Sequence, residues 1–217
     1  MSAPGRQELA TLLVRAAAEL GVPLSAAQVG QFMTFLAELE TWSAKVSLTA
    51  IRRPRDIILK HFADSLSVVP HLEGCGSLLD VGSGAGLPGL AVKIARPHLR
   101  LVSVESRRRK VSFQEHICRT LGLAGVEVIW GYLAPGCGLL AEESVECAVS
   151  RALALPDFLA AALPFVAPGG RLISLQGRRP AEAAAPAGLA LTSQVGLRLP
   201  VSGEERTLVI FEKQRHR

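Results

Sequence analysis

A ten-residue segment near the middle of the chain combines glycines with a carboxylate in a way that suits a charged ligand. The segment DVGSGAGLPG, residues 80–89, begins at the end of an apolar run. Glycines let a strand turn sharply into a helix and let a ligand approach the backbone. Asp80 opens the segment, and Glu105 ends the next apolar run. Carboxylates at these two positions can accept hydrogen bonds from a ligand's amino-acid end and from ribose hydroxyls.

Three interpretations of this segment are open on the residues alone. The spacing Gly84-x-Gly86-x-x-Gly89 formally fits a dinucleotide fingerprint, in which an acidic residue also binds ribose. A tight turn without a ligand is the second, with Asp80 and Glu105 as incidental charges. The third is S-adenosylmethionine, because Asp80 can accept from the amino-acid end of that molecule and favours its sulfonium charge. The position of Asp80, two residues before Gly82, favours the third interpretation.

The elements that must position this segment form an alternating pattern. Apolar runs at 77–81, 101–105, 126–130, 145–150 and 170–176 are separated by helical stretches at 88–95, 107–121 and 156–166. Alternation of this kind predicts a parallel sheet with helices on both faces. Strands at 190–199 and 206–212, joined by a turn at 202–205, predict an antiparallel hairpin at one edge. We therefore expect an α/β, Rossmann-like sheet that is mostly parallel, with that hairpin at its C-terminal end.

The first third of the chain has a helical pattern. Apolar residues repeat at helical spacing over residues 9–20, Ser25 and Gln28 form a capping box for a second helix, and Pro54 suits the first turn of a third. We expect residues 1–70 to form a helical cap on the sheet domain, residues 71–217.

Three polar residues share one face of the third predicted helix. His61, Asp64 and Ser65 lie at positions i, i+3 and i+4. They could border a ligand, but we favour a hydrogen-bond network that holds the cap on the sheet. The network predicts polar contacts between this helix and the sheet domain.

Composition argues against several other kinds of protein. No apolar run approaches the roughly 20 residues that cross a bilayer, and the first residues lack the order of a secretory signal. The four cysteines have no CxxC spacing, so we expect four reduced thiols and no metal site. We expect a cytoplasmic monomer that does not contact membranes.

The charge pattern indicates a second kind of partner. The net charge is +5, and basic residues cluster at 52–55, 107–110, 178–179 and 213–217. Such clusters bind RNA phosphates in some proteins and are solvated surface in others. The overall arginine bias also fits a compositional bias of the genome. The residues that we select as RNA-binding candidates are Arg52, Arg107, Arg108, Lys110 and Arg206.

Several segments, taken in order, resemble one known family. The chain is similar to the bacterial small-subunit ribosomal RNA methyltransferase G family, also called glucose-inhibited division protein B. The resemblance runs from about residue 25 to the end of the sequence. Its specificity comes from the combination and order of the motifs. The matching segments are LTAIR at 48–52, KHFADSL at 60–66, DVGSGAGLPG at 80–89, SRA at 150–152, PGGRL at 168–172 and RTLVIFEK at 206–213.

The resemblance implies an activity, a cofactor and a partner. Members methylate N7 of a guanine in 16S ribosomal RNA with S-adenosylmethionine as the donor, so the expected partner is 16S rRNA or the small ribosomal subunit. Family position makes Ser47, Ser150 and Arg151 candidates for positioning the acceptor. The cofactor-binding candidates from the local motif and the family together are Asp80, Gly82, Gly84, Gly86, Leu87, Glu105, Leu133, Ala134 and Arg151.

Methyl transfer to such an acceptor explains why no catalytic base stands out. The sequence shows no obvious Ser-His-Asp or paired-carboxylate arrangement. Guanine N7 is already an unprotonated nucleophile at neutral pH, so the enzyme mainly has to align nitrogen, methyl and sulfur and exclude water.

The chain also departs from the family at three positions. Ser47, Gln176 and Ala134 stand where the family commonly has Asn, Lys and an acid. The departures at Ser47 and Gln176 leave room for a methyltransferase with another acceptor. A nicotinamide-dependent oxidoreductase and a non-enzymatic RNA-binding protein are the further alternatives.

Overall fold

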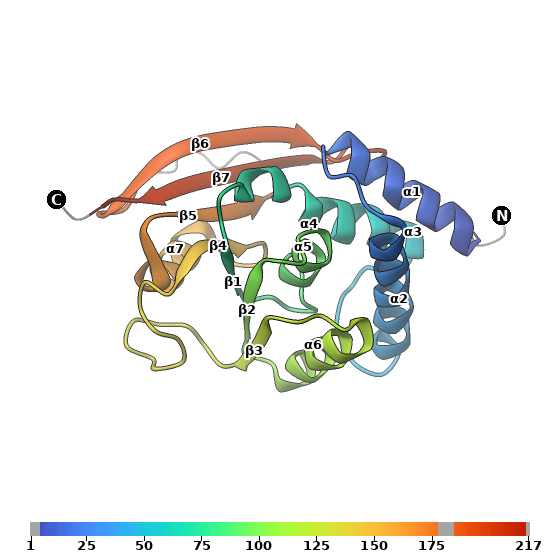
Figure 1. The fold of residues 1–217 in the computed structure, drawn as a ribbon, viewed down its shortest axis with the longest axis horizontal. Helices are drawn as coiled ribbons and strands as arrows, with labels where there is room; N and C mark the ends of the chain where they lie inside the picture. Colours follow the sequence, from blue (N-terminus) through green and yellow to red (C-terminus); the bar gives the residue numbers. More distant parts are fainter. Residues whose placement is uncertain (1–4, 178–184, 216–217) are drawn as a thin grey trace.

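A seven-stranded sheet forms the centre of the described part of the molecule. The structure is a computed structural model that describes residues 5–177 and 185–215. The strand order is β3-β2-β1-β4-β5-β7-β6 (Figure 1). The bounds are β1 (Ser77–Val81), β2 (Arg100–Glu105), β3 (Val126–Trp130), β4 (Val145–Ser150), β5 (Val166–Gln176), β6 (Leu189–Arg198) and β7 (Glu205–Lys213).

The strand directions bring the expected site residues to one edge of the sheet. Strand β1 pairs in parallel with β2 and with β4, and β7 pairs antiparallel with β5 and β6. The strand order therefore reverses between β1 and β4, and ligands of open α/β sheets bind outside the carboxyl ends of the strands at such a point. The predicted α/β class, mostly parallel sheet and C-terminal antiparallel hairpin are confirmed.

Helical segments precede the sheet in the sequence and connect several of its strands. The bounds are α1 (Arg6–Glu19), α2 (Ala26–Ser43), α3 (Pro54–Ile57), η1 (Ile58–Ala63), α4 (Asp64–Leu66), η2 (Val69–Leu72), α5 (Gly89–Ala95), α6 (Arg108–Leu121), α7 (Leu155–Ala162) and η3 (Leu163–Phe165). The predicted capping box is present, because Ser25 Oγ accepts from the Gln28 amide and Gln28 Oε1 accepts from the Ser25 amide. The third helix contains a π-helical segment, η1, which the apolar pattern did not predict.

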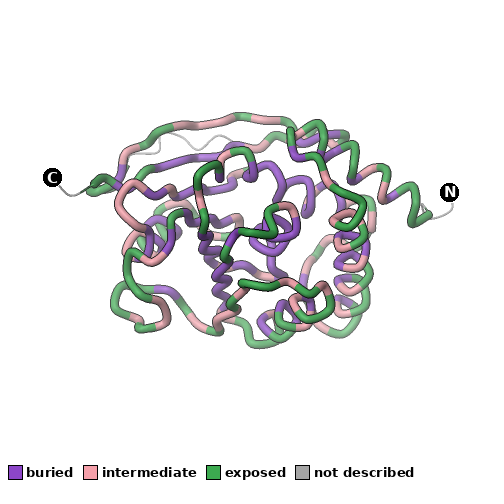
Figure 2. The backbone as a smooth tube through the Cα atoms, in the orientation of Figure 1, coloured by how far each residue is buried: buried purple, intermediate pink, exposed green. Residues whose placement is uncertain are grey.

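Two hydrophobic clusters lie on opposite faces of the sheet. Neighbouring residues Leu78 and Leu79 of β1 belong to different clusters, because successive side chains of a strand point to opposite faces. The larger cluster joins the cap helices to the sheet, with Leu13 of α1 and Phe32 of α2 fully buried in it. Figure 2 shows these buried segments running from the sheet into the helices. The division of the chain at residue 70 stays a prediction.

One expectation about the cysteines is wrong. Cys75 and Cys147 form a disulfide, and their Cα atoms lie 6.4 Å apart. Cys75 precedes β1 and Cys147 lies in β4, so the pairing of these two strands brings together residues that are 72 apart in sequence. The other two cysteines, Cys118 and Cys137, are free thiols as expected.

Some of the predicted features lie outside the residues that the structure describes, and others can be compared with it only within those residues. The basic pair Arg178 and Arg179 and the last two residues of the basic tail lie outside the described residues. Within residues 5–177 and 185–215, no helix is both long and apolar enough to cross a membrane. In the same ranges, no group of three or more His, Cys, Asp or Glu side chains could hold a metal ion.

Candidate functional site

The glycine-rich segment turns sharply from β1 into α5. Gly82 has a φ of +71°, a left-handed conformation that glycine adopts without steric cost. The amides of Gly82 and Ser83 donate to the carbonyl of Val104, at 3.0 and 3.2 Å, which fastens the turn to the end of β2. The backbone of the turn is therefore held at the carboxyl edge of the sheet, where a ligand can approach it.

Asp80 lies beneath this turn and is fully buried. Its Oδ2 accepts from the Gly89 amide at 2.7 Å, whereas Oδ1 is buried without a hydrogen-bond partner. Burial raises the pKa of Asp80 to about 7, although the Gly89 hydrogen bond and the charge of Arg151 act in the opposite direction. A buried carboxylate oxygen without a partner is costly unless a donor reaches it. Asp80 is therefore a candidate acceptor for a cationic ligand group.

Glu105 ends β2 and closes against the same turn. Its Oε2 accepts from the Gly84 amide at 2.8 Å, and its Oε1 accepts from the Arg107 amide at 2.7 Å. The side chain is buried, with 6% of its surface exposed. Each carboxylate oxygen offers two lone pairs, so Oε2 keeps one for a further donor such as a ribose hydroxyl.

Gln114 holds the turn from below and was missed in the sequence. It is fully buried on α6, and its Nε2 donates to Ser83 Oγ at 2.8 Å and to the Gly84 carbonyl at 2.9 Å. Its Oε1 accepts from Ser103 Oγ at 2.6 Å. The available signal was a glutamine amid the apolar residues of an amphipathic helix. Three hydrogen bonds from one amide fix the turn relative to β2.

Replacing Gln114 by leucine should loosen the turn. The substitution leaves buried polar groups without partners, and we expect a loss of about 2 kcal/mol in the free energy of unfolding. We expect the affinity for S-adenosylhomocysteine to fall about tenfold, measured by calorimetry. The control is Gln31→Leu, which removes one hydrogen bond to the Leu121 carbonyl away from the turn. Equal affinities of the two variants would contradict a positioning role for Gln114.

Arg151 follows β4 and belongs to a charged cluster at the switch point. Its Nη1 lies 3.3 Å from the Lys60 carbonyl and 3.5 Å from Asp64 Oδ2. Asp64 is buried and also accepts from Arg206 Nε at 2.8 Å. The Asp64 carboxylate therefore joins the cap helix, the end of β4 and the start of β7. The predicted network between cap and sheet is confirmed for Asp64.

The other members of the predicted network have local partners. His61 Nε2 lies 2.7 Å from Thr49 Oγ1 in the preceding loop, and Ser65 Oγ donates to the His61 carbonyl in its own helix. Burial, with the charge of Arg151, lowers the pKa of His61 to about 3. The imidazole is therefore neutral at physiological pH and is not a cationic contact.

A cavity of about 380 Å³ opens beside this cluster. It lies at the carboxyl ends of β4 and β5 and at the start of β7, next to the edge that carries the glycine-rich turn. Apolar, cationic and acidic side chains share its wall, which suits a ligand that is both planar and polar. The lining residues are Ile51, Lys60, His61, Asp64, Arg151, Leu175, Gly177, Glu204 and Arg206.

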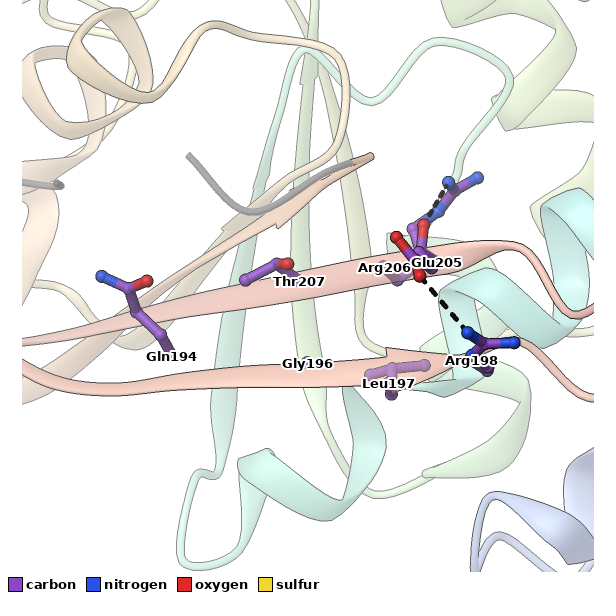
Figure 3. Close-up of a pocket in the computed structure, with 7 residues that line it drawn as sticks. All are labelled: Gln194, Gly196, Leu197, Arg198, Glu205, Arg206 and Thr207. Carbon is purple, nitrogen blue, oxygen red and sulfur yellow. Dashed lines mark hydrogen bonds and ion pairs between the residues drawn. The ribbon is translucent and has the colours of Figure 1, made fainter. Parts of the chain in front are cut away.

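A second cavity, of about 420 Å³, lies along the hairpin. Figure 3 shows its lining residues on β6 and β7, with Glu205 paired to Arg198 at 3.5 Å. Arg206 lines both cavities. No residue of the glycine-rich turn lines either one, but the first cavity contains Arg151, whose charge acts on Asp80. The first cavity is therefore the better candidate for a site adjoining that turn.

The positioning and pocket residues that we selected from sequence have different surroundings. Ser150 is buried and its Oγ donates to the Val81 carbonyl at 2.9 Å, so this hydroxyl ties β4 to β1. Leu87 and Leu133 are buried, whereas Ser47 and Ala134 are exposed. The structure thus brings Asp80, Glu105 and Arg151 to one edge of the sheet and leaves Ser47 at the surface.

The RNA-binding candidates are spread over several surfaces. Arg52 donates to the Ser43 carbonyl at the end of α2, and Arg206 is engaged with Asp64. Arg107 is exposed, and the exposed Arg108 lies over the Trp130 ring at 4.7 Å from its centroid. Lys110 Nζ lies 3.7 Å from the position that a Gly84 Cβ would occupy, so it is close to the glycine-rich turn.

Comparison with known proteins decides the family. The family described as rRNA small subunit methyltransferase G matches residues 28–209. A protein of that name from Geobacter metallireducens is 40% identical over 216 residues, covering 96% of this chain and 98% of that protein. Another from Myxococcus xanthus is 39% identical, covering 90% of this chain and 93% of its own length. The chain belongs to the rRNA small subunit methyltransferase G family.

Solved structures of other proteins share the fold of this chain. A SAM dependent methyltransferase from Aquifex aeolicus matches with a TM-score of 0.55 at 18% identity, covering 73% of this chain and 93% of that chain. Geranyl diphosphate C-methyltransferase from Streptomyces coelicolor, solved with S-adenosyl-L-homocysteine, matches with a TM-score of 0.54 at 14% identity, covering 70% and 78%. At these identities the likeness establishes a shared methyltransferase fold.

Proposed function

We propose that the protein transfers a methyl group from S-adenosylmethionine to N7 of a guanine in 16S ribosomal RNA. Membership of the rRNA small subunit methyltransferase G family supports the reaction and the RNA. The observation that carries the cofactor is the buried Asp80 Oδ1, which has no hydrogen-bond partner at the start of the glycine-rich turn. The nicotinamide and non-enzymatic alternatives are set aside because the chain belongs to a methyltransferase family.

The residues at the turn fit the proposed cofactor. Asp80 would accept from its amino-acid end, and Glu105 from its ribose hydroxyls. Gly82, Gly84, Gly86 and Leu87 would form the turn against it, Leu133 and Ala134 would lie near the adenine, and Arg151 would border the site. When bound, S-adenosylmethionine supplies an electrophilic methyl group on a sulfonium.

The chain's own residues would act by orientation and electrostatics. Guanine N7 carries its lone pair at neutral pH, so no residue has to remove a proton before attack. The product guanine gains a positive charge, which a nearby carboxylate can stabilise. Asp64 and Glu204 in the adjacent cavity provide carboxylates, while Arg151 and Arg206 hold Asp64 in place. Alignment and exclusion of water would supply most of the rate enhancement.

Labelled methyl donor tests the proposed function directly. The purified protein is incubated with the donor and either unmethylated small subunits or their naked RNA. We expect label at N7 of a guanine in at least one of the two substrates. Label on another atom or molecule would favour a different acceptor, which the departures at Ser47 and Gln176 left open. Absence of label in both substrates would overturn the rRNA activity.

The raised pKa of Asp80 predicts pH-dependent cofactor binding. A cationic ligand favours the ionised carboxyl, so binding should lower the pKa of Asp80 from about 7 and release a proton. Affinity for S-adenosylmethionine should therefore rise from pH 5.5 to 7, by up to about tenfold per pH unit. Calorimetry at pH 6.5 in buffers of different ionisation enthalpy measures the proton.

A control separates this effect from general titration of the surface. Asp157→Asn changes an exposed carboxyl on α7 and should keep the pH dependence, whereas Asp80→Asn should lose it. In the free protein, the contribution of Asp80 to folding stability changes with pH in the opposite direction to the cofactor affinity. A folded pKa above the unfolded value of about 3.9 means that Asp80 lowers stability progressively as pH rises from about 4 to 7. If the affinity of the wild type for S-adenosylmethionine did not change between pH 5.5 and 7, Asp80 would not be an acceptor for the cofactor.

A further inference from the structure

We infer that the cavity beside Arg151 is the pocket for the acceptor guanine, and that Glu204 recognises the Watson–Crick edge of that base. The inference rests on the proposed function, which supplies the guanine and its N7. The cavity measures about 380 Å³, within the size range of small-ligand pockets. Ile51 of the cap and Leu175 of β5 give its wall apolar surface, which suits the faces of a planar base.

The reaction itself restricts which edge of the base can be recognised. N7 is the nucleophile, so the edge that carries N7 must face the methyl donor. The Watson–Crick edge stays free for contacts that select guanine, and there guanine presents the donors N1–H and N2–H₂. An ionised carboxylate accepts from two such donors, and enzymes that act on an extruded base read it through this edge.

Glu204 is the carboxylate of the cavity that is placed for this contact. Asp64, the other one, is buried and uses one oxygen for each of two arginines. The Glu204 side chain is 37% exposed. Its Oε1 lies 2.6 Å from Lys60 Nζ, while Oε2 has a longer ion pair, 3.6 Å to Arg206 Nη2. Oε2 can therefore accept from a ligand without losing a short bond.

The backbone around Glu204 is fixed at the mouth of the cavity. Its carbonyl accepts from the Leu199 amide at 2.8 Å, and its amide donates to Ser202 Oγ at 3.4 Å. Glu204 in turn raises the pKa of Lys60 through their hydrogen bond. The contact with the ammonium group orients the Glu204 carboxylate at the mouth of the cavity.

The test compares guanosine with inosine, which keeps N7 and N1–H but lacks the exocyclic amino group. RNA is prepared with either nucleoside at the position that the wild type methylates. For the wild type we expect kcat/KM to be about tenfold lower with inosine, the value of one charged hydrogen bond. For Glu204→Ala we expect at least tenfold lower activity on guanosine and an inosine-to-guanosine ratio near one. Glu204→Gln should lie between the two.

Glu205→Gln is the matched control. Glu205 is the next residue, is exposed and pairs with Arg198 on the hairpin, outside this cavity. It should keep both the activity and the ratio of the wild type. Calorimetry with S-adenosylhomocysteine should give the same affinity for all four proteins, because Glu204 is placed on the acceptor and not on the cofactor.

The outcomes separate this inference from the proposed function. Equal wild-type activity on the two nucleosides, or a wild-type ratio retained by both Glu204 variants, would overturn the role of Glu204 while leaving the reaction intact. A wild type that methylates neither RNA would overturn the proposed function, and the inference with it. An inosine-to-guanosine ratio that rises part of the way toward one in Glu204→Gln, with unchanged cofactor affinity, would support both, and this variant preserves the shape of the side chain.

Discussion

Replacing Gly89 by alanine should lower the affinity for S-adenosylmethionine by about 100-fold and destabilise the protein. A Cβ at Gly89 would lie 2.7 Å from Asp80 Oδ2, 3.0 Å from Asp80 Cβ and 3.1 Å from Leu101 Cδ1. Asp80 is fully buried beneath the turn, and Oδ2 and Cβ of Asp80 both lie against the added methyl group. Relief of the overlap therefore has to displace the turn itself, and overpacking of this kind costs about 3 kcal/mol.

The close approach of Gly89 also serves a hydrogen bond. Its amide donates to Asp80 Oδ2, so the same displacement that accommodates a Cβ would lengthen this bond. Asp80 would then lose its backbone partner, and both of its oxygens would lie away from their positions for the cofactor. Calorimetry with S-adenosylhomocysteine and chemical unfolding measure the two losses separately.

Gly30→Ala is the control for the same chemical change. Gly30 lies in α2, and no atom lies within 4 Å of the position that its Cβ would occupy. Alanine is favoured over glycine in a helix, so this variant should be more stable by about 0.5–1 kcal/mol and bind the cofactor as the wild type does. If Gly89→Ala bound S-adenosylhomocysteine as tightly as Gly30→Ala does, the close contact between Gly89 and Asp80 would not hold the turn in place for the cofactor.

Asp64→Asn is expected to give the second large effect. The substitution keeps the shape of the side chain but removes the charge that pairs with Arg151 and Arg206. Removing one partner of a buried ion pair costs about 3–5 kcal/mol. The two arginine side chains keep 21% and 20% exposure and are partly solvated, so we expect the lower end, about 3 kcal/mol. The midpoint temperature of thermal unfolding, Tm, should then fall by roughly 6–12 °C.

Activity should fall in the same variant, because Asp64 orients Arg151 at the edge of the site. A displacement of about 1 Å in a positioning group can cost about 100-fold in rate, and we expect kcat/KM to fall by that order. Glu19→Gln provides a contrast, since its pair with Arg15 is exposed, with 69% and 43% of the two side chains accessible. That variant should lose at most about 0.5 kcal/mol and no activity. If Asp64→Asn had the same Tm and the same kcat/KM as Glu19→Gln, the ion pairs of Asp64 with Arg151 and Arg206 would support neither stability nor activity.

Local pattern in the sequence was enough to predict the fold and to select the candidate cofactor-binding residues. Apolar runs and turn residues placed β1, β3 and β4 at their observed bounds, because short apolar runs and glycine-rich turns are properties of neighbouring residues. The turn chemistry also identified Asp80 and Glu105, since a carboxylate at a strand end is visible from spacing alone. The π-helical segment η1 was not visible, because its apolar pattern is close to that of an α-helix.

Tertiary structure alone decided which polar side chains meet. Asp64 and Arg206 are 142 residues apart and become partners only when the cap helix packs beside the start of β7. Arg206 is consequently an ion-pair partner of Asp64, and its contact with RNA stays a prediction. Gln114 supports the glycine-rich turn because α6 lies against β2, and Cys75 meets Cys147 because β1 pairs with β4. Such contacts depend on strand order and packing of distant segments, and the spacing of residues along the chain carries no direct record of either.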